Sequence, residues 1–125
     1  MYIRFTIPSD DYRPERRTAA GIFGATYRLV EDGRFERGER LWFETEMEWF
    51  DAYLPATLNL SDRRAVCWFR GDAGQAISRV WRIAELVERE GVPVIVYRTR
   101  RPGLVVYRDA LQIAAVPWRD TFGVH

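Results

Sequence analysis

The fold is decided by residues 64–99, which read RAVCWFRGDAGQAISRVWRIAELVEREGVPVIVYRT. Residues 65–69 form an apolar run within a strand expected over residues 64–70. Residues 92–99 are apolar on both faces until Arg98, as expected of a central strand. Between them, apolar residues recur at helical spacing: Ala73, Ile77, Val80, Trp81, Ala84 and Val87. A strand, a helix and a strand joined by a right-handed crossover predict that the two strands run parallel.

The helix of this unit has the clearest end signals in the chain. Asp72 is placed as its N-cap, Gln75 stands three residues later as a capping box requires, and Gly91 closes the helix. The same placement puts Arg79 on the outer face of the helix. Because side chains alternate along a strand, we expect Cys67 to face the helix layer as a small core residue.

The chain before this unit predicts one strand and two helices. Residues 2–7 predict a strand that Pro8 ends, and a polar loop follows over residues 9–18. Helices are expected over residues 19–32, closed by Gly33, and over residues 39–54, which stop before Pro55. A loop over residues 56–63 leads into the central unit.

The chain after the unit predicts two more strands. Pro102 and Gly103 indicate a turn, and strands follow over residues 104–108 and 111–116, with a turn at Asp109 and Ala110. The order β-α-α-β-α-β-β-β predicts a single α+β domain over residues 1–125. We expect a two-layer α/β sandwich, with a mixed sheet of about five strands and three helices on one face.

The residue content excludes several classes of chemistry. His125 is the only histidine and Cys67 the only cysteine, so neither a zinc site nor a histidine-assisted nucleophile is expected. All 19 basic residues are arginine, which excludes Schiff-base and P-loop lysine chemistry. We therefore expect no catalytic residues, no metal and no cofactor, and a non-enzymatic role is favoured.

The chain also lacks the patterns of export and of membrane insertion. Its first residues alternate and carry Arg4, which is typical of a strand and not of a secretory segment. No apolar run approaches the length of a membrane span, and a lone cysteine provides no disulfide framework. We expect a cytoplasmic protein that does not associate with membranes.

Several short motifs spread along most of the chain resemble a family of short uncharacterised bacterial proteins with no assigned activity. The motifs are Met1–Phe5, Ile7-Pro8, Gly21–Phe23, Tyr27, Gly33, Trp49-Phe50, Ala65–Phe69, Arg101–Gly103, Val106-Tyr107, Asp109, Gln112 and Pro117. The chain departs from the family pattern at Leu104, where an aromatic is expected, and at Arg108, where an acidic residue is expected. The resemblance implies a bacterial, cytoplasmic, single-domain protein and no site residues.

A first candidate site is an anion-binding corner beyond the ends of the parallel strands. Arg70, Arg98 and Arg100 are expected there, beside the free N–H groups that follow Asp72. Guanidinium forks and a helix N-terminus suit a phosphate, a nucleotide or a carboxylate. The alternative is that Asp72 caps the helix and neutralises Arg70, which leaves no vacancy.

A second candidate site is a basic hairpin over residues 97–108. Its cations are Arg98, Arg100, Arg101 and Arg108, interleaved with Tyr97 and Tyr107. Such a ribbon suits a nucleic-acid backbone, with tyrosines available for stacking. An edge-protecting ribbon is the favoured alternative, because a pI near 7.9 is too low for a dedicated nucleic-acid binder.

A third candidate site is an aromatic stripe on the helix over residues 39–54. Trp42, Trp49 and Tyr53 lie beside the core stripe, with Glu46 between them. If exposed, this stripe suits a protein interface; contact with the first helix through Tyr27 or Phe35 explains it equally well. The leading hypothesis is therefore a protein-binding or adaptor module whose partner is another protein or a second copy of the chain in a homodimer, with anion binding and nucleic-acid binding as alternatives.

Overall fold

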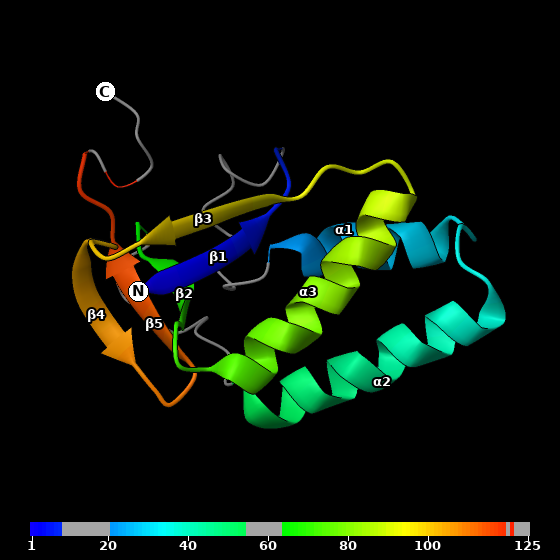
Figure 1. Ribbon diagram of the computed structural model, residues 1–125, viewed down its shortest axis with the longest axis horizontal. Coiled ribbons are helices and arrows are strands. Elements are labelled where there is room, and N and C mark those ends of the chain that lie inside the picture. The colour runs from blue at the N-terminus through cyan, green and yellow to red at the C-terminus, as the bar shows by residue number, and fades with distance from the viewer. Residues whose placement is uncertain (9–20, 55–63, 120, 122–125) are drawn as a thin grey trace.

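The eight predicted elements occur in the predicted order in the computed structural model, which describes residues 1–8, 21–54, 64–119 and 121 (Figure 1). The predicted loops over residues 9–18 and 56–63, and residues 19–20 of the expected first helix, lie outside the described residues. The elements are β1 (Tyr2–Thr6), α1 (Ile22–Glu31), α2 (Arg37–Tyr53), β2 (Val66–Arg70), α3 (Gly74–Arg89), β3 (Ile95–Thr99), β4 (Leu104–Arg108) and β5 (Gln112–Val116). The predicted α+β class is confirmed.

The five described strands form one sheet in the order β3-β1-β2-β5-β4, and every pairing in it is antiparallel. The predicted mixed sheet is therefore wrong. β2 and β3 run in the same direction, as the crossover rule requires, but β1 lies between them and is antiparallel to both. The crossover thus spans one inserted strand, which the local sequence of residues 64–99 does not reveal.

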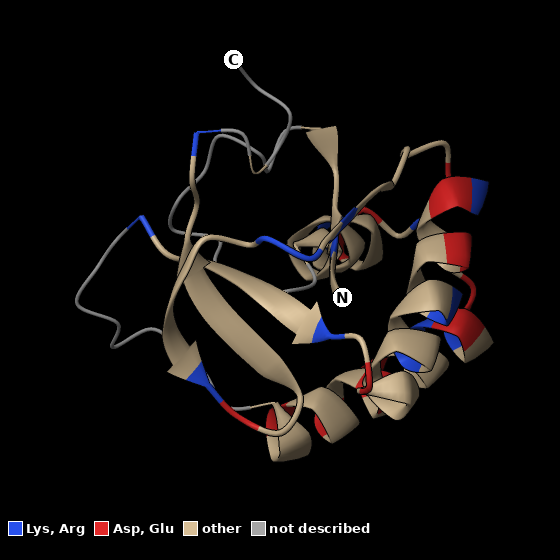
Figure 2. Ribbon diagram, turned by 60° about the vertical axis from the view of Figure 1, so that its left-hand side comes forward, with Lys and Arg blue, Asp and Glu red and all other residues tan. Residues whose placement is uncertain are grey.

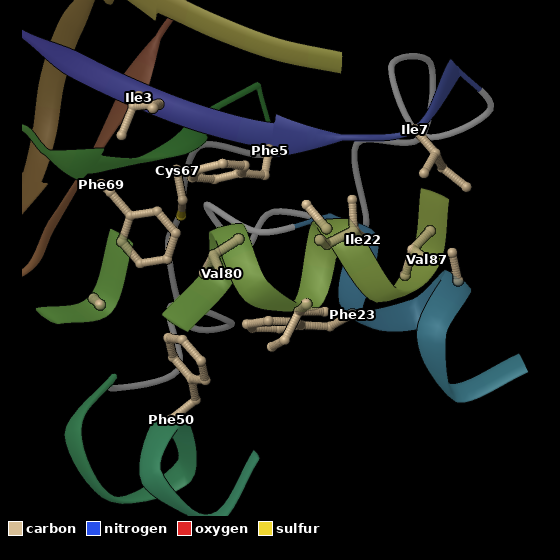
Figure 3. Close-up of a cluster of buried hydrophobic side chains, with 14 of the residues drawn as sticks. Ile3, Phe5, Ile7, Ile22, Phe23, Phe50, Cys67, Phe69, Val80 and Val87 are labelled. Carbon is tan, nitrogen blue, oxygen red and sulfur yellow. The ribbon is translucent and has the colours of Figure 1, made fainter. Parts of the chain in front are cut away.

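The three helices pack on one face of the sheet, where the main core lies. Alternating side chains of β1 and β2 point toward this layer, and Figure 3 shows Phe5, Cys67 and Phe69 directed at Val80 of α3. Cys67 and Val80 are fully buried, so the predicted core position of Cys67 is confirmed. The buried face of α3 also includes Ile83 and Leu86, which the predicted apolar pattern omitted.

The opposite face of the sheet holds a second, smaller core around Trp68. Ile113 and Ala115 are buried with it, and Tyr97 of β3 and Val105 of β4 pack against the same cluster. These two strands are at opposite ends of the strand order, so both edges of the sheet approach Trp68. The sheet is therefore curled around this side chain.

The short connection between β3 and β4 requires this curl. Thr99 and Leu104 are five residues apart, so the link spans at most about 17 Å. Four strand spacings in a flat sheet add up to about 19 Å, before any displacement along the strands. Figure 1 shows the end of β3 beside the start of β4, which is possible only in a strongly twisted and curled sheet.

Glycines mark the ends of the elements where the sequence predicted them. Gly33 and Gly91 follow α1 and α3 with φ of 70° and 84°, which confirms both predicted helix ends. Gly103 has φ of 123°, and a Cβ placed there would lie 1.9 Å from the carbonyl oxygen of Val116. The turn into β4 therefore excludes any side chain at this position.

The predicted capping box at the start of α3 is wrong. The helix begins at Gly74 with Ala73 as its N-cap, and no side chain caps it. Asp72 lies outside the helix and pairs instead with Arg70. A capping box does occur at the start of α2, between Glu36 and Glu39, where no N-terminal signal was predicted.

Candidate functional site

The aromatic stripe of α2 lies along the junction with α3. Glu46 is only 4% exposed, and its carboxylate forms an ion pair with the guanidinium of Arg79 from α3. The same guanidinium lies over the ring of Trp49, with its central carbon 4.5 Å from the ring centroid. Arg79 is thus a junction residue, and its predicted position on the outer face of α3 is wrong.

This arrangement divides the predicted interface residues into interior and surface groups. Glu46 belongs to the interior, because a buried carboxylate requires the cation that α3 supplies. Trp49 is half-buried under Arg79 and stacks on Tyr53, with 5.0 Å between the ring centroids. Tyr53 is 61% exposed. Only part of the stripe is therefore available to a partner.

The ring contact that Tyr27 of α1 makes with α2 falls outside the stripe, and Phe35 packs against the main core, so the alternative explanation through Tyr27 or Phe35 stays a prediction. Tyr27 packs edge-on against Phe43, with 5.1 Å between the ring centroids. Burial raises its pKa above 10.0, and the charges of Asp51 and Glu44 raise it further. Those two carboxylates lie on the flank of α2 away from Glu46, so Tyr27 of α1 and Arg79 of α3 meet α2 on different flanks.

A hollow of about 370 Å³ opens between α2 and α3 at the Trp42 end of the stripe. We call the residues that line it the docking face: Gly38, Glu39, Trp42, Arg82, Glu85, Leu86 and Arg89. Half-buried Trp42 and buried Leu86 supply its apolar lining. Two carboxylates and two guanidiniums supply its charges, and Arg89 lies 3.7 Å from Glu39. The sequence pointed to Trp42, but the contribution of α3 to this site was missed.

Arg70, the centre of the predicted anion corner, has partners within the fold. Its guanidinium lies 3.3 Å from the carboxylate of Asp72 and donates to the main-chain carbonyl of Asp109 at 3.2 Å. A hollow of about 480 Å³ lies beside it, lined also by Met1, Tyr2 and Gly71. This geometry matches one part of the alternative expected from the sequence, the pairing of Asp72 with Arg70, but Asp72 does not cap the helix and a hollow remains beside Arg70.

The structure does not bring Arg98 to this corner. Arg70 of β2 is paired with Tyr2 of β1, and Arg98 of β3 is paired with Ile3 of β1. Paired residues share a face of the sheet and consecutive residues alternate, so the two arginines lie on opposite faces. Arg98 instead extends over Trp81 of α3, 5.8 Å from the ring centroid. Arg100 is exposed in the link between β3 and β4.

The predicted basic hairpin is wrong as a structure, because β3 and β4 do not pair with each other. They occupy opposite ends of the strand order, with three strands between them. Arg101 lies over Trp118, 5.2 Å from the ring centroid, and Arg108 is exposed at the end of β4. The four arginines therefore do not form one continuous ribbon.

Asp109 is the centre of a hydrogen-bond network that the sequence did not reveal. Its carboxylate accepts bonds from the Tyr107 hydroxyl, from the main-chain N–H groups of Leu111 and Gln112, and from the Gln112 side chain, at 2.8–3.1 Å. Burial opposes its ionisation, but these bonds outweigh that effect and lower the pKa of Asp109. The hydrogen bond that the Tyr107 hydroxyl donates to this carboxylate raises the pKa of Tyr107. The network closes the predicted turn between β4 and β5.

The described residues contain no group of three or more histidine, cysteine, aspartate or glutamate side chains that could hold a metal ion. Nor does any helix in the described ranges have the length and apolarity needed to cross a membrane. Comparison of the chain with protein-family models, with curated proteins and with solved structures gives no match. The site must therefore be interpreted from its own geometry.

Proposed function

We propose that this protein is a non-enzymatic protein-binding module, and that a second copy of the chain binds at the docking face. The hollow between α2 and α3 carries this proposal, because half-buried Trp42 offers an apolar surface there inside a charged rim. A partly buried aromatic surrounded by polar residues is typical of the residues that dominate binding energy in protein interfaces. We also propose a cytoplasmic location and kinship with the short bacterial proteins that the chain resembles.

The rim charges favour self-association over an unrelated partner. The docking face carries Glu39 and Glu85 together with Arg82 and Arg89. In a two-fold dimer each patch meets its own copy, so a patch with both signs can place every charge near an opposite one. A patch of one sign repels its own copy.

Gly38 allows this proposal to be tested without disturbing the core. A Cβ placed there has no neighbour within 4 Å, and Gly38 lines the hollow. We expect the wild-type chain to show a concentration-dependent monomer–dimer equilibrium by sedimentation velocity. The Gly38→Tyr variant should fill the hollow and sediment as a monomer, with a melting temperature no lower than that of wild type.

Gly74 provides a matched control. It is also in the first turn of a helix, and a Cβ placed there has no neighbour within 4 Å, but it lies about 18 Å along α3 from Leu86. Gly74→Tyr should therefore leave the dimer intact. A wild-type chain that stays monomeric at millimolar concentration would refute self-association at this face, and so would a Gly38→Tyr variant that dimerises as wild type does.

A further inference from the structure

β4 is an edge strand with exposed apolar side chains. It is the last strand of the sheet, and in the described part of the chain it pairs only with β5. Leu104 is 62% exposed and Val106 is 42% exposed. Proteins usually protect such an edge with charges, with proline or with a covering segment, because its free N–H and C=O groups attract another strand. Here the exposed side chains at the start of β4 (Leu104) and at the irregularity in its pairing with β5 (Val106) are apolar, and the charges lie beyond them.

An ordered tryptophan extends this apolar surface. Leu104 is paired with Val116 of β5, and Trp118 follows two residues later. The N–H of Trp118 donates to the Thr121 hydroxyl at 2.9 Å, and the N–H of Thr121 donates back to the carbonyl of Trp118 at 3.1 Å. Trp118 is nevertheless 46% exposed. Its ring lies under the guanidinium of Arg101, 5.2 Å from the ring centroid, and a large aromatic ring with one face exposed is suited to anchor a partner.

The charges around this edge are positive. Arg100 and Arg101 precede β4, Arg108 ends it, and Arg119 follows Trp118; all four are exposed. The nearby carboxylate of Asp109 is occupied by Tyr107, Leu111 and Gln112. The five strands contain four arginines and no carboxylate, and Figure 2 shows most of the acidic residues on the helices.

We infer that the β4 edge binds an extended segment of another protein, in which apolar residues are flanked by carboxylates. The segment adds a sixth strand beside β4, its apolar side chains cover Leu104, Val106 and Trp118, and its carboxylates meet the arginines at both ends of β4. A second copy of β4 does not fit, because its arginines would meet like charges. This surface is distinct from the docking face, so a dimer formed through the docking face can bind a peptide at each β4 edge.

The test uses a synthetic peptide as the probe. The peptide alternates valine and threonine over six residues and carries two glutamates at each end. A second version has the same side chains but methyl groups on alternate main-chain nitrogens, which block strand pairing. Fluorescence anisotropy of the labelled peptides should show binding of the first and loss of at least about tenfold in affinity for the second. Hydrogen exchange should slow at the amides of residues 104–108 when the first peptide is added.

Charge reversal tests the proposed recognition. Arg108→Glu should weaken binding of the glutamate-flanked peptide by about tenfold and strengthen binding of a lysine-flanked one. Arg28→Glu, an exposed position on α1, is the matched control and should change neither. The dimer-blocking Gly38→Tyr variant should bind the peptide as wild type does, which separates this result from the proposed dimer.

Three outcomes would overturn the inference. Equal binding of the methylated and unmethylated peptides would show that no strand is added. Unchanged exchange at residues 104–108 would place the peptide elsewhere. A dimer that Leu104→Lys dissociates, in place of peptide binding, would show that the edge is occupied by a second copy of the chain.

Discussion

At the residue scale, Asp109 shows how one side chain secures the join between two strands. Four hydrogen bonds reach its carboxylate, and its own N–H donates to the carbonyl of Gln112 at 2.9 Å. Because these bonds favour the charged form more than burial opposes it, the pKa of Asp109 is lowered in the folded protein. A lowered pKa in the folded state means that ionisation of Asp109 stabilises the fold.

The Asp109→Asn variant should therefore lose stability in a pH-dependent way. We expect a loss of about 1.5–3 kcal/mol at neutral pH, the usual effect of hydrogen bonds to a charged group. The contribution of the carboxylate is fully present above the pKa of the unfolded chain, near 4, and disappears as pH falls through the lower pKa of the folded protein. Thermal unfolding between pH 7 and pH 2.5 should show that the difference in melting temperature between wild type and variant becomes smaller below pH 4. A difference that stays constant over this range would contradict this role.

At the scale of elements, the junction between α2 and α3 depends on one buried ion pair. Glu46 is held among apolar side chains of α2, and Arg79 of α3 supplies its counter-charge. The guanidinium of Arg79 also lies over the ring of Trp49. Removing one member leaves the other uncompensated, whereas replacing both with apolar residues removes the desolvation cost altogether.

A double-mutant cycle measures this dependence. Arg79→Leu alone should destabilise the fold by about 2–4 kcal/mol, because it leaves the buried carboxylate of Glu46 without a cation. Adding Glu46→Leu should restore most of that loss. Urea denaturation of the four proteins provides the free energies. If the two changes prove additive, the ion pair between Glu46 and Arg79 contributes little to the stability of the fold.

At the scale of the whole molecule, the sheet separates two cores. The larger core lies between the sheet and the three helices, and the smaller one lies in the curl of the sheet around Trp68. Cys67 and Trp68 are adjacent in β2, fully buried and on opposite faces, so β2 contributes to both cores. We therefore expect the two cores to unfold together.

Labelling of the Cys67 thiol tests this cooperativity. Because Cys67 is fully buried beneath α3, a bulky thiol reagent should reach it only when the protein unfolds globally. The free energy of protection from labelling should then equal the free energy of unfolding measured with urea. Rapid labelling in native buffer, or a protection energy well below the unfolding energy, would show that α3 separates from the sheet independently.

Much of the local structure was predictable from the sequence. The eight elements, their order, the glycines that end α1 and α3, and the inward side chain of Cys67 all follow from patterns that repeat within a few residues. Backbone geometry explains this success, because helical and strand periodicity and positive φ depend on near neighbours in the chain.

Long-range features were decided only by the tertiary structure. Insertion of β1 between β2 and β3, the curl that brings Tyr97 and Val105 to Trp68, and the pairing of Arg79 with Glu46 join residues far apart in sequence. Asp72 likewise had two physically reasonable partners, a helix N-terminus and Arg70, and only the folded geometry selects between them. The sequence alone determines which segments become strands and helices, because that choice depends on local periodicity. The neighbours of each strand and the partners of each charge depend on how the whole chain buries its apolar surface, and only the tertiary structure decides them.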